Sequence, residues 1–202
     1  MTFKPHRFHS SLAHTLLSMI EKRLFVVLAT VVLFFSSQAV YGERDGTRAT
    51  WTFQNPLPTG NELRSVWGAD AKNVWAVGND GTIVKWDGAT WTKQVSVTTE
   101  PLYGVYGTGP NNVWAVGWGG TIVKWDGSTW STQSSGTTDH LTSIYGVDAK
   151  NVWAVGINGT IVKWDGSTWT TQASGTTNHL LGVYGADANV WAVGDKGTIL
   201  HN

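Results

Sequence analysis

The sequence predicts an all-β fold, a β-propeller of four-stranded antiparallel blades with about four blades in this chain. A unit of nearly forty residues recurs along it, marked by Trp75, Trp114, Trp153 and Trp191 at spacings of 39, 39 and 38 residues. Each copy contains several short runs of β-branched and aromatic residues separated by turns with Gly. The 13 Trp and 24 Gly residues suit repeated short strands whose large rings pack between sheets. A repeat of this length and pattern is typical of a propeller blade.

Each repeat contains four predicted strands. The first begins at a Leu and reads LYGVYG or a close variant, at Leu63, Leu102, Leu141 and Leu180. The second reads NVWAVG and begins at Asn73, Asn112, Asn151 and Asn189. The third reads TIVKW from Thr82, Thr121 and Thr160, and is shortened to TIL at Thr198. The fourth begins with TW, at Thr90, Thr129 and Thr168. Because a second strand is enclosed by neighbouring sheets, its Trp is expected in the core between blades.

The turns within each repeat are chemically specific. The turns between second and third strands end in a Gly that can take positive φ in a tight hairpin, at residues 79–81, 118–120, 157–159 and 195–197. Between third and fourth strands, Asp-Gly pairs at Asp87, Asp126 and Asp165 predict an Asx-type turn, in which the carboxylate accepts hydrogen bonds from nearby backbone N–H groups. The links between repeats, such as 134–140 and 174–179, are rich in Ser and Thr.

Two partial copies flank the complete repeats. Residues 49–54, ATWTFQ, match ATWTKQ at 89–94 but precede the first complete repeat, and the last repeat shows only its first three strands. Pairing of residues 50–54 with residues 198–200 would let an N-terminal strand complete the last blade and remove an exposed sheet edge. A homodimer that exchanges this strand and closes as eight blades is the alternative to a four-bladed monomer.

The N-terminal segment predicts export. A basic stretch is followed by a twelve-residue apolar run, Leu24 to Phe35, and then by Ser-Ser-Gln-Ala. This is the pattern of a signal peptide over residues 1–39, cleaved after Ala39, with Met19 as an alternative start. Residues 40–48 then form a short linker and residues 49–202 the propeller, which is expected to be secreted or periplasmic. An uncleaved anchor is the alternative, although the apolar run is short for a membrane span.

Composition excludes several classes of function. The chain has no Cys, so disulfides and Cys-ligated metals are absent. Its formal net charge is zero, but residues 43–202 carry ten basic and thirteen acidic side chains. No basic face for nucleic acid is expected from this balance.

The motif V-W-A-V-G, followed by G-T-I-V, D-G-x-T-W and a Q-x-S-G-T tail, resembles the propeller repeats of the photosystem II stability and assembly factor-like family, which is related to Asp-box (BNR) repeats. The resemblance covers residues 49–202, and the motif is also similar to tectonin-type lectin repeats. It implies a propeller fold. Two features depart from the family pattern. Asp126 and Trp130 are four residues apart where an Asp-box has five, and Arg64 is the only Arg after Arg48, so the basic patch of the photosystem factors is not expected.

No enzyme activity is expected. Glycosidases, the first enzyme class to consider for an Asp-box propeller, generally need a pair of carboxylates across the scissile bond. The acids Asp87, Asp126 and Asp165 instead recur at equivalent turn positions, which suggests that they close turns. His140 and His179 occupy equivalent links, but a metal pair would need further converging ligands. We therefore expect no metal and no cofactor. The polar residue beside each His is expected to cap the turn or form a hydrogen bond with it.

The candidate binding surface combines the links between repeats with the turns between second and third strands, which propellers present on one face. Its candidate residues are Trp118, Asn79, Asp80, Asn158, Asp195, Lys196, Asp139, His140, Asn178 and His179, with Glu100 beside them. An exposed aromatic among Asn and Asp suits a protein rim or a sugar. The sequence favours a protein-binding or assembly scaffold, with a carbohydrate-binding lectin as the alternative. Trp118 is singled out because it alone of the 13 Trp lies outside the repeat register.

Overall fold

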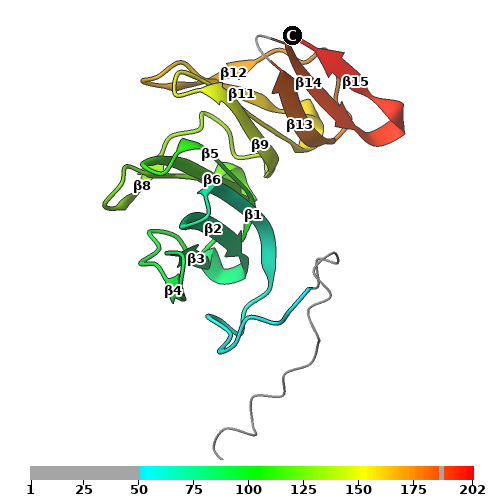
Figure 1. The fold of residues 1–202 in the computed structure, drawn as a ribbon. Coiled ribbons are helices and arrows are strands. Elements are labelled where there is room, and N and C mark those ends of the chain that lie inside the picture. The colour runs from blue at the N-terminus through cyan, green and yellow to red at the C-terminus, as the bar shows by residue number, and fades with distance from the viewer. Residues whose placement is uncertain (1–50, 187–188) are drawn as a thin grey trace, which may run out of the picture. The chain divides into compact units, whose positions relative to one another are not determined.

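A computed structural model describes residues 51–186 and 189–202. The predicted signal peptide (1–39), the linker (40–48) and the first two residues of the predicted propeller lie outside the described residues. Residues 53–202 form one compact unit of strands joined by short turns (Figure 1). Among the described residues, no helical segment has the length and apolar character needed to cross a membrane.

The strands form four antiparallel sheets in sequence order (Figure 1). The first sheet contains β1 (Leu63–Asp70), β2 (Asn73–Gly78), β3 (Ile83–Trp86) and β4 (Trp91–Lys93). The second contains β5 (Leu102–Gly109), β6 (Asn112–Gly117), β7 (Ile122–Trp125) and β8 (Trp130–Gln133). The third contains β9 (Leu141–Asp148), β10 (Asn151–Gly156), β11 (Ile161–Trp164) and β12 (Trp169–Gln172). The fourth contains β13 (Leu180–Ala186), β14 (Asn189–Gly194) and β15 (Ile199–His201).

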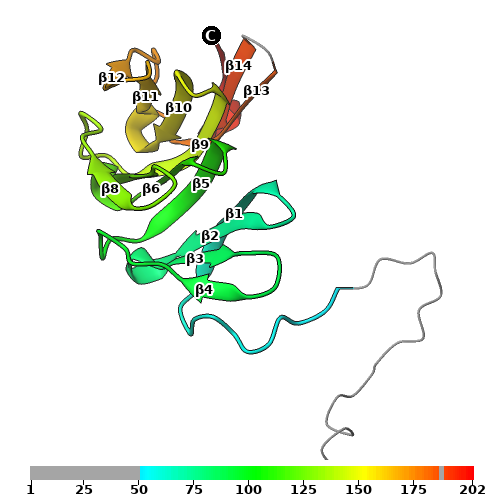
Figure 2. The same ribbon diagram turned by 60° about the vertical axis from the view of Figure 1, so that its left-hand side comes forward.

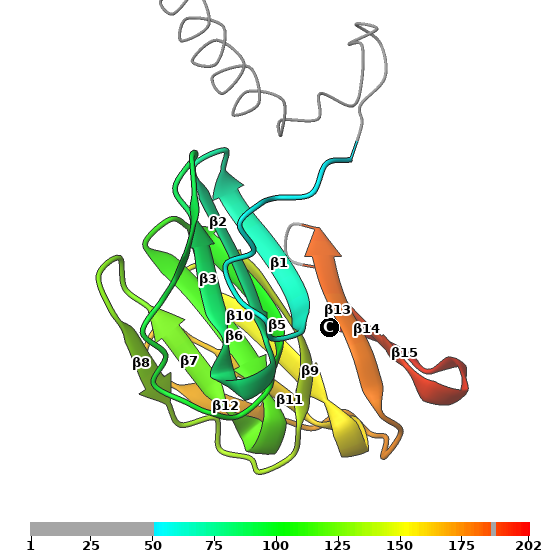
Figure 3. The same ribbon diagram turned by 90° about the horizontal axis from the view of Figure 1, so that it is seen from below.

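The observed strands confirm the predicted strand pattern. First and second strands begin at the predicted Leu and Asn residues, and each third strand begins one residue after its Thr. In the second sheet Trp114 of β6 pairs with Tyr106 of β5 and with Lys124 of β7. The first strands β1, β5, β9 and β13 lie side by side, so consecutive sheets meet along their inner strands (Figures 2 and 3).

Three apolar layers between consecutive sheets form the core. In the middle layer, Trp114, Val116 and Ile122 of the second sheet pack against residues of the third sheet that include Ile144 and Trp164. The layers on either side use the equivalent residues of their own sheets. Trp75, Trp114 and Trp153 are all buried, which confirms the prediction that they fill the space between sheets. The same prediction is wrong for Trp191, which is 47% exposed because no further sheet of the described chain covers it.

A lysine of the third strand adds a cation–π contact to each layer. The ammonium of Lys124 lies 4.9 Å from the ring centre of Trp114 in its own sheet and 5.0 Å from that of Trp164 in the next sheet. Lys85 bridges Trp75 and Trp125 in the same way, at 4.9 and 5.5 Å. Such contacts stabilise a charged group near an apolar layer, because the aromatic face carries negative potential. Burial lowers the pKa of Lys124 from its ordinary value.

The Asp-Gly turns have the predicted Asx geometry. Asp126 Oδ1 accepts hydrogen bonds from the backbone N–H groups of Ser128 and Thr129, each at 2.8 Å. These bonds, that of Thr129 above all, lower the pKa of Asp126 to about 2, because they favour the charged carboxylate. The equivalent bonds lower the pKa values of Asp87 and Asp165.

The predicted closing strand is not formed in this structure, and ring closure is therefore not shown. Phe53 and Gln54 belong to no strand, and Phe53 is exposed. The last sheet has three strands, and Trp191 on β14 is 47% exposed where the other second-strand Trp residues are buried. Val66 on β1 is also exposed. The exposure of both residues shows that the last sheet does not pack against the first.

Candidate functional site

The links and the turns between second and third strands lie together at one end of the sheets, as predicted. The turns are single 3₁₀ turns, η1 (Asn79–Gly81), η2 (Trp118–Gly120), η3 (Ile157–Gly159) and η4 (Asp195–Gly197). The first residue of each turn donates its backbone N–H to a carbonyl in the link before the same sheet. In the second sheet, for example, Trp118 donates to Pro101 at 2.9 Å, and in the third Ile157 donates to His140 at 3.0 Å. We call this surface the link-and-turn face.

Left-handed backbone shapes every turn of this face. The middle residue has φ between 54° and 62° in all four turns, at Asp80, Gly119, Asn158 and Lys196. The final Gly also has positive φ, 72° at Gly120, which confirms the hairpin prediction. A Cβ on Gly120 would collide with the backbone carbonyl of Thr137 in the following link. Each of the first three turns therefore contacts two links, one before and one after its own sheet.

His140 holds the turn that carries Trp118. Its Nδ1 accepts a hydrogen bond of 2.9 Å from the backbone N–H of Gly119, and its ring stacks on the indole of Trp118 with ring centres 3.6 Å apart. An Nδ1 that accepts a bond places the proton of the neutral imidazole on Nε2. Trp118 remains 45% exposed, so one face of the indole is supported by His140 while part of the ring is open to solvent.

His179 repeats this arrangement one sheet later, without an aromatic partner. Its Nδ1 accepts a 3.0 Å hydrogen bond from the backbone N–H of Asn158. The turn at this position begins with Ile157 in place of a Trp. Both His residues thus bond a neighbouring turn, in agreement with the structural interpretation of the sequence.

The polar residue before each His bonds the next turn and third strand. Asp139 accepts hydrogen bonds from Thr160 Oγ1 at 2.6 Å and from Asn158 Nδ2 at 3.0 Å, and these bonds lower its pKa. Asn178 donates to Thr198 Oγ1 at 2.9 Å. Asn61 donates to Thr82 Oγ1 at 2.8 Å and has the same role in the first sheet. Sequence reasoning missed Asn61, although its position two residues before the first-strand Leu matches those of Asp139 and Asn178.

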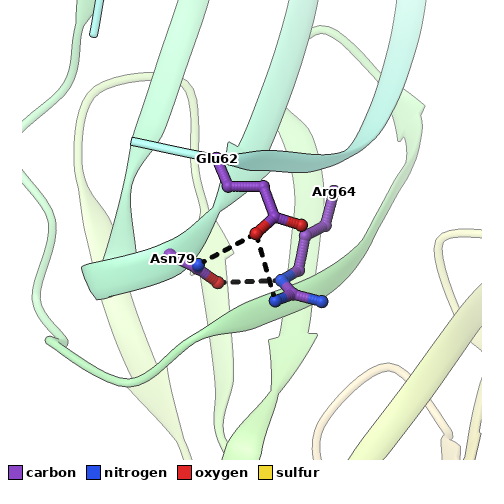
Figure 4. Close-up of polar contacts among 3 residues, drawn as sticks. All are labelled: Glu62, Arg64 and Asn79. Atoms are coloured by element: carbon purple, nitrogen blue, oxygen red, sulfur yellow. Dashed lines mark hydrogen bonds and ion pairs between the residues drawn. The ribbon is translucent and has the colours of Figure 1, made fainter. Parts of the chain in front are cut away.

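Asn79 is part of a polar cluster at the first sheet. Arg64 Nε donates to Asn79 Oδ1 at 2.8 Å, Asn79 Nδ2 donates to Glu62 at 3.3 Å, and Arg64 forms an ion pair with Glu62 at 3.5 Å (Figure 4). The Arg64 guanidinium also lies 5.3 Å from the ring centre of Tyr103 in the second sheet. The one Arg of this face is therefore engaged by neighbours on three sides.

The remaining predicted site residues contribute charge to the rim. Among the described residues, the side chains of Asp80, Asp195 and Lys196 form no hydrogen bond or ion pair, while the backbone carbonyl of Asp195 accepts a hydrogen bond of 2.7 Å from Thr198 Oγ1. Asp80 and Lys196 are exposed at the tips of their turns. The structure thus places all ten predicted residues on one face but divides them into an internally bonded set and an exposed set.

Shallow hollows lie beside this face and at the opposite end. One, of about 580 Å³, is lined by Gly119 and Gly120, the two residues after Trp118, and by residues 133–138. A hollow of about 600 Å³ repeats this feature at residues 174–177. A third, of about 640 Å³, lies at the other end of the inner strands and includes Trp67, Tyr106 and Pro110. The sequence pattern did not indicate this third hollow, because the candidate residues all lie at the opposite end of the blades. No group of three or more His, Asp or Glu side chains in the described ranges is placed to hold a metal ion.

Comparison with known proteins supports the fold. No family model matches the sequence, and no curated protein matches it. Among solved structures, YCF48 bound to a D1 peptide is similar with a TM-score of 0.59 and 19% identity, over 72% of this chain and 51% of that chain. YCF48 from Cyanidioschyzon merolae gives a TM-score of 0.59 and 17% identity, over 69% and 50% of the two chains. This chain thus spans about half the length of the YCF48 chains it matches.

Identities this low show the fold alone. The four sheets are arranged like successive blades of a propeller, and the likeness to YCF48 confirms, for the fold, the resemblance to the photosystem II assembly factor-like propellers.

Proposed function

We propose that this chain is an exported, non-enzymatic scaffold that binds a protein segment on its link-and-turn face, with Trp118 as the anchoring side chain. One observation carries the proposal: the indole of Trp118 stacks on the ring of His140 yet is partly open to solvent, and the two residues that follow it line a shallow hollow. A Trp in this state offers a large contact area at little cost in conformational entropy, which is the property of residues that dominate protein binding energy.

The polar residues of the face favour a protein partner over a sugar. A sugar site needs carboxylates and amides that are free to bond hydroxyl groups. Asp139, Asn178 and Asn79 instead bond their own neighbours. What remains available is the indole of Trp118 with a rim of exposed charge, including Asp80 and Lys196. This combination suits a protein interface, in which an aromatic centre is surrounded by a polar rim.

The solved relative adds support of a general kind. One YCF48 structure contains a bound D1 peptide, so a propeller of this fold is able to hold a peptide. The open hollows beside residues 134–138 and 174–177 are shallow, as expected of a surface that receives an extended chain. We infer a peptide or protein of the compartment outside the cytoplasm as the partner, because the N-terminal segment has the pattern of a signal peptide.

Binding is tested with a Trp118→Ala variant and a matched Ile157→Ala control. Ile157 occupies the same first position in the next turn but has no stacked ring, so its loss controls for a change in the turn. Partners are first identified by peptide arrays and by glycan arrays. We expect peptide ligands whose affinity falls at least about tenfold in Trp118→Ala and stays unchanged in the control. Glycan ligands without peptide ligands would support the lectin alternative and contradict the proposal.

Two structural parts of the proposal concern residues at the N-terminus. We propose that residues 1–39 direct export and are removed, so that mass spectrometry of the exported protein should find Val40 as its first residue. A retained N-terminus in the exported protein would contradict cleavage. We also propose that residues 49–54 supply the fourth strand of the sheet β13–β14–β15, as the match between ATWTFQ and ATWTKQ suggests.

A further inference from the structure

The first and last sheets each expose an apolar face that the inner sheets bury. On the last sheet, Trp191, Val193 and Ile199 are exposed, whereas their equivalents Trp114, Val116 and Ile122 are buried in the second sheet. On the first sheet, Leu63 and Val66 are exposed, whereas the equivalent Leu102 and Val105 are buried. Apolar side chains exposed together on a sheet face mark a surface that is covered by another group.

The two exposed faces are complementary because of the repeat. In the first two internal layers, the Trp, Val and Ile of one sheet pack on a first-strand Leu and a first-strand Val or Ile of the next sheet. The last sheet presents the first half of this layer, and the first sheet presents the second half. A fourth layer of the same kind would therefore form wherever a last sheet meets a first sheet.

A cavity shows what is missing from the third layer. It has a volume of about 200 Å³ and a mixed lining, with Trp153, Val183 and Leu200 among its apolar residues and Gln172, His201 and Asn202 among its polar ones. In the layer between second and third sheets, Trp164 and Trp169 pack against the equivalent residues. The last sheet has Asn202 in place of the first of these and no described strand that carries the second.

Lysine contacts agree with this comparison. Lys124 lies over two Trp rings, one in its own sheet and one in the next. Lys163, its equivalent, lies 4.9 Å from the ring centre of Trp153 in its own sheet, and no Trp of the last sheet occupies the second position. Trp51 has the register of Trp169, the fourth-strand Trp of the inner layer, because ATW at 49–51 matches ATW at 89–91.

We propose that a second copy of this chain covers both faces: its first sheet packs on the last sheet, and its residues 49–54 complete that sheet with Trp51 in the cavity. The reciprocal contact closes a ring of eight sheets with twofold symmetry. The proposal rests on the strand completion proposed above and specifies which copy supplies the strand. A head-to-tail contact that closes after two copies leaves no exposed edge, as required of a discrete assembly.

The course of the chain favours a second copy over closure within one chain. A ring of four sheets must turn twice as sharply at each layer as a ring of eight. The four sheets match about half of a YCF48 chain, which is longer than this one. In this arrangement the first and last sheets do not pack against each other. Two copies joined end to end therefore continue the existing curvature, whereas a four-sheet ring would have to change it.

Cysteine cross-linking distinguishes the two origins of the strand. The chain has no Cys, so introduced pairs are the only ones that can form. Lys124 pairs with Ser131 across β7 and β8, and the repeat makes His201 and Thr52 the equivalent pair. The K124C/S131C variant is the positive control and should cross-link within one chain. Single T52C and H201C variants, unfolded together, refolded and oxidised, should give a disulfide-linked dimer containing one chain of each kind.

Other outcomes of this experiment overturn the proposal in distinguishable ways. Cross-linking of a T52C/H201C double variant only within one chain would retain the strand completion but refute the second copy. No cross-link between positions 52 and 201, with the control pair formed, would refute both. Neither result depends on the binding function proposed for Trp118.

Molar mass measured by light scattering gives an independent test on the chain expressed with its own N-terminal segment. We expect twice the mass of one chain at micromolar concentration, and a dissociation constant raised at least about tenfold by Trp51→Ala. Thr52→Ala is the control, because alternation along a strand places residue 52 on the face opposite to Trp51. A mass of one chain, a mass larger than two chains, or an unchanged dissociation constant in Trp51→Ala would each overturn the proposal.

Discussion

Trp114 is fully buried between the second and third sheets, and its replacement by Ala removes one of the three Trp side chains of that layer. A buried Trp removes about 150–250 Å² from water, which at about 25 cal/mol per Å² stabilises the fold by roughly 4–6 kcal/mol. The indole N–H of Trp114 has no hydrogen-bond partner in the described part of the chain. An unpaired buried donor offsets about 1–3 kcal/mol of this gain. The difference is about 1–5 kcal/mol, and the cavity that Ala leaves adds to it, so we expect Trp114→Ala to lower the free energy of unfolding by about 3–5 kcal/mol, in the range of other Trp→Ala substitutions in cores.

The equivalent substitution at the open end provides the matched control. Trp191 is 47% exposed, so at concentrations where the chain is monomeric Trp191→Ala should cost about half as much, roughly 2 kcal/mol. Urea unfolding followed by circular dichroism measures both variants, with an unchanged m value as the check that unfolding remains two-state. A cost below about 1 kcal/mol for Trp114→Ala, or equal costs for the two variants in the monomer, would refute the assignment of Trp114 to a closed layer and Trp191 to an open one.

Two further predictions concern the turns. Because the folded pKa of Asp126 is lowered to about 2, its hydrogen bonds stabilise the fold fully above the unfolded pKa of about 3.9 and are lost as the pH falls through about 2. The melting temperature should fall over this pH window, and less steeply in Asp126→Asn; equal slopes in both proteins would contradict the role of the carboxylate. Gly120→Asn should cost at least about 2 kcal/mol, because its Cβ meets the Thr137 carbonyl, whereas Gly119→Asn should be nearly neutral. Both positions have positive φ, so the collision is the difference between the two variants. Equal losses of unfolding free energy in Gly120→Asn and Gly119→Asn, measured by urea unfolding, would contradict the prediction.

The repeated parts of this protein could be predicted from the sequence because they are determined by local pattern. The alternation in NVWAVG, the Gly at the end of each turn and the Asp-Gly pairs act over a few residues, and each recurs in the structure where it was expected. The burial of Trp114 followed from the same pattern, since a second strand between two sheets has no solvent-facing side.

Contacts across the link-and-turn face were decided by the tertiary structure. The stacking of His140 on Trp118 joins residues 22 positions apart on two elements, and no periodic signal marks it. The sequence identified both residues as candidates but not their contact. The bonds of Asp139 and Asn178 likewise turn candidate ligand-binding groups into internal partners, which is the reason that protein binding is now favoured over sugar binding.

The two ends of the array show the physical difference most clearly. The sequence by itself determined that Trp191 carries the same side chain, in the same strand position, as Trp114. Only the tertiary structure decided that one is buried and the other exposed, because burial depends on a neighbouring sheet and not on the residue. A repeat encodes both halves of each layer, but whether a final layer forms depends on how far the preceding layers turn the chain.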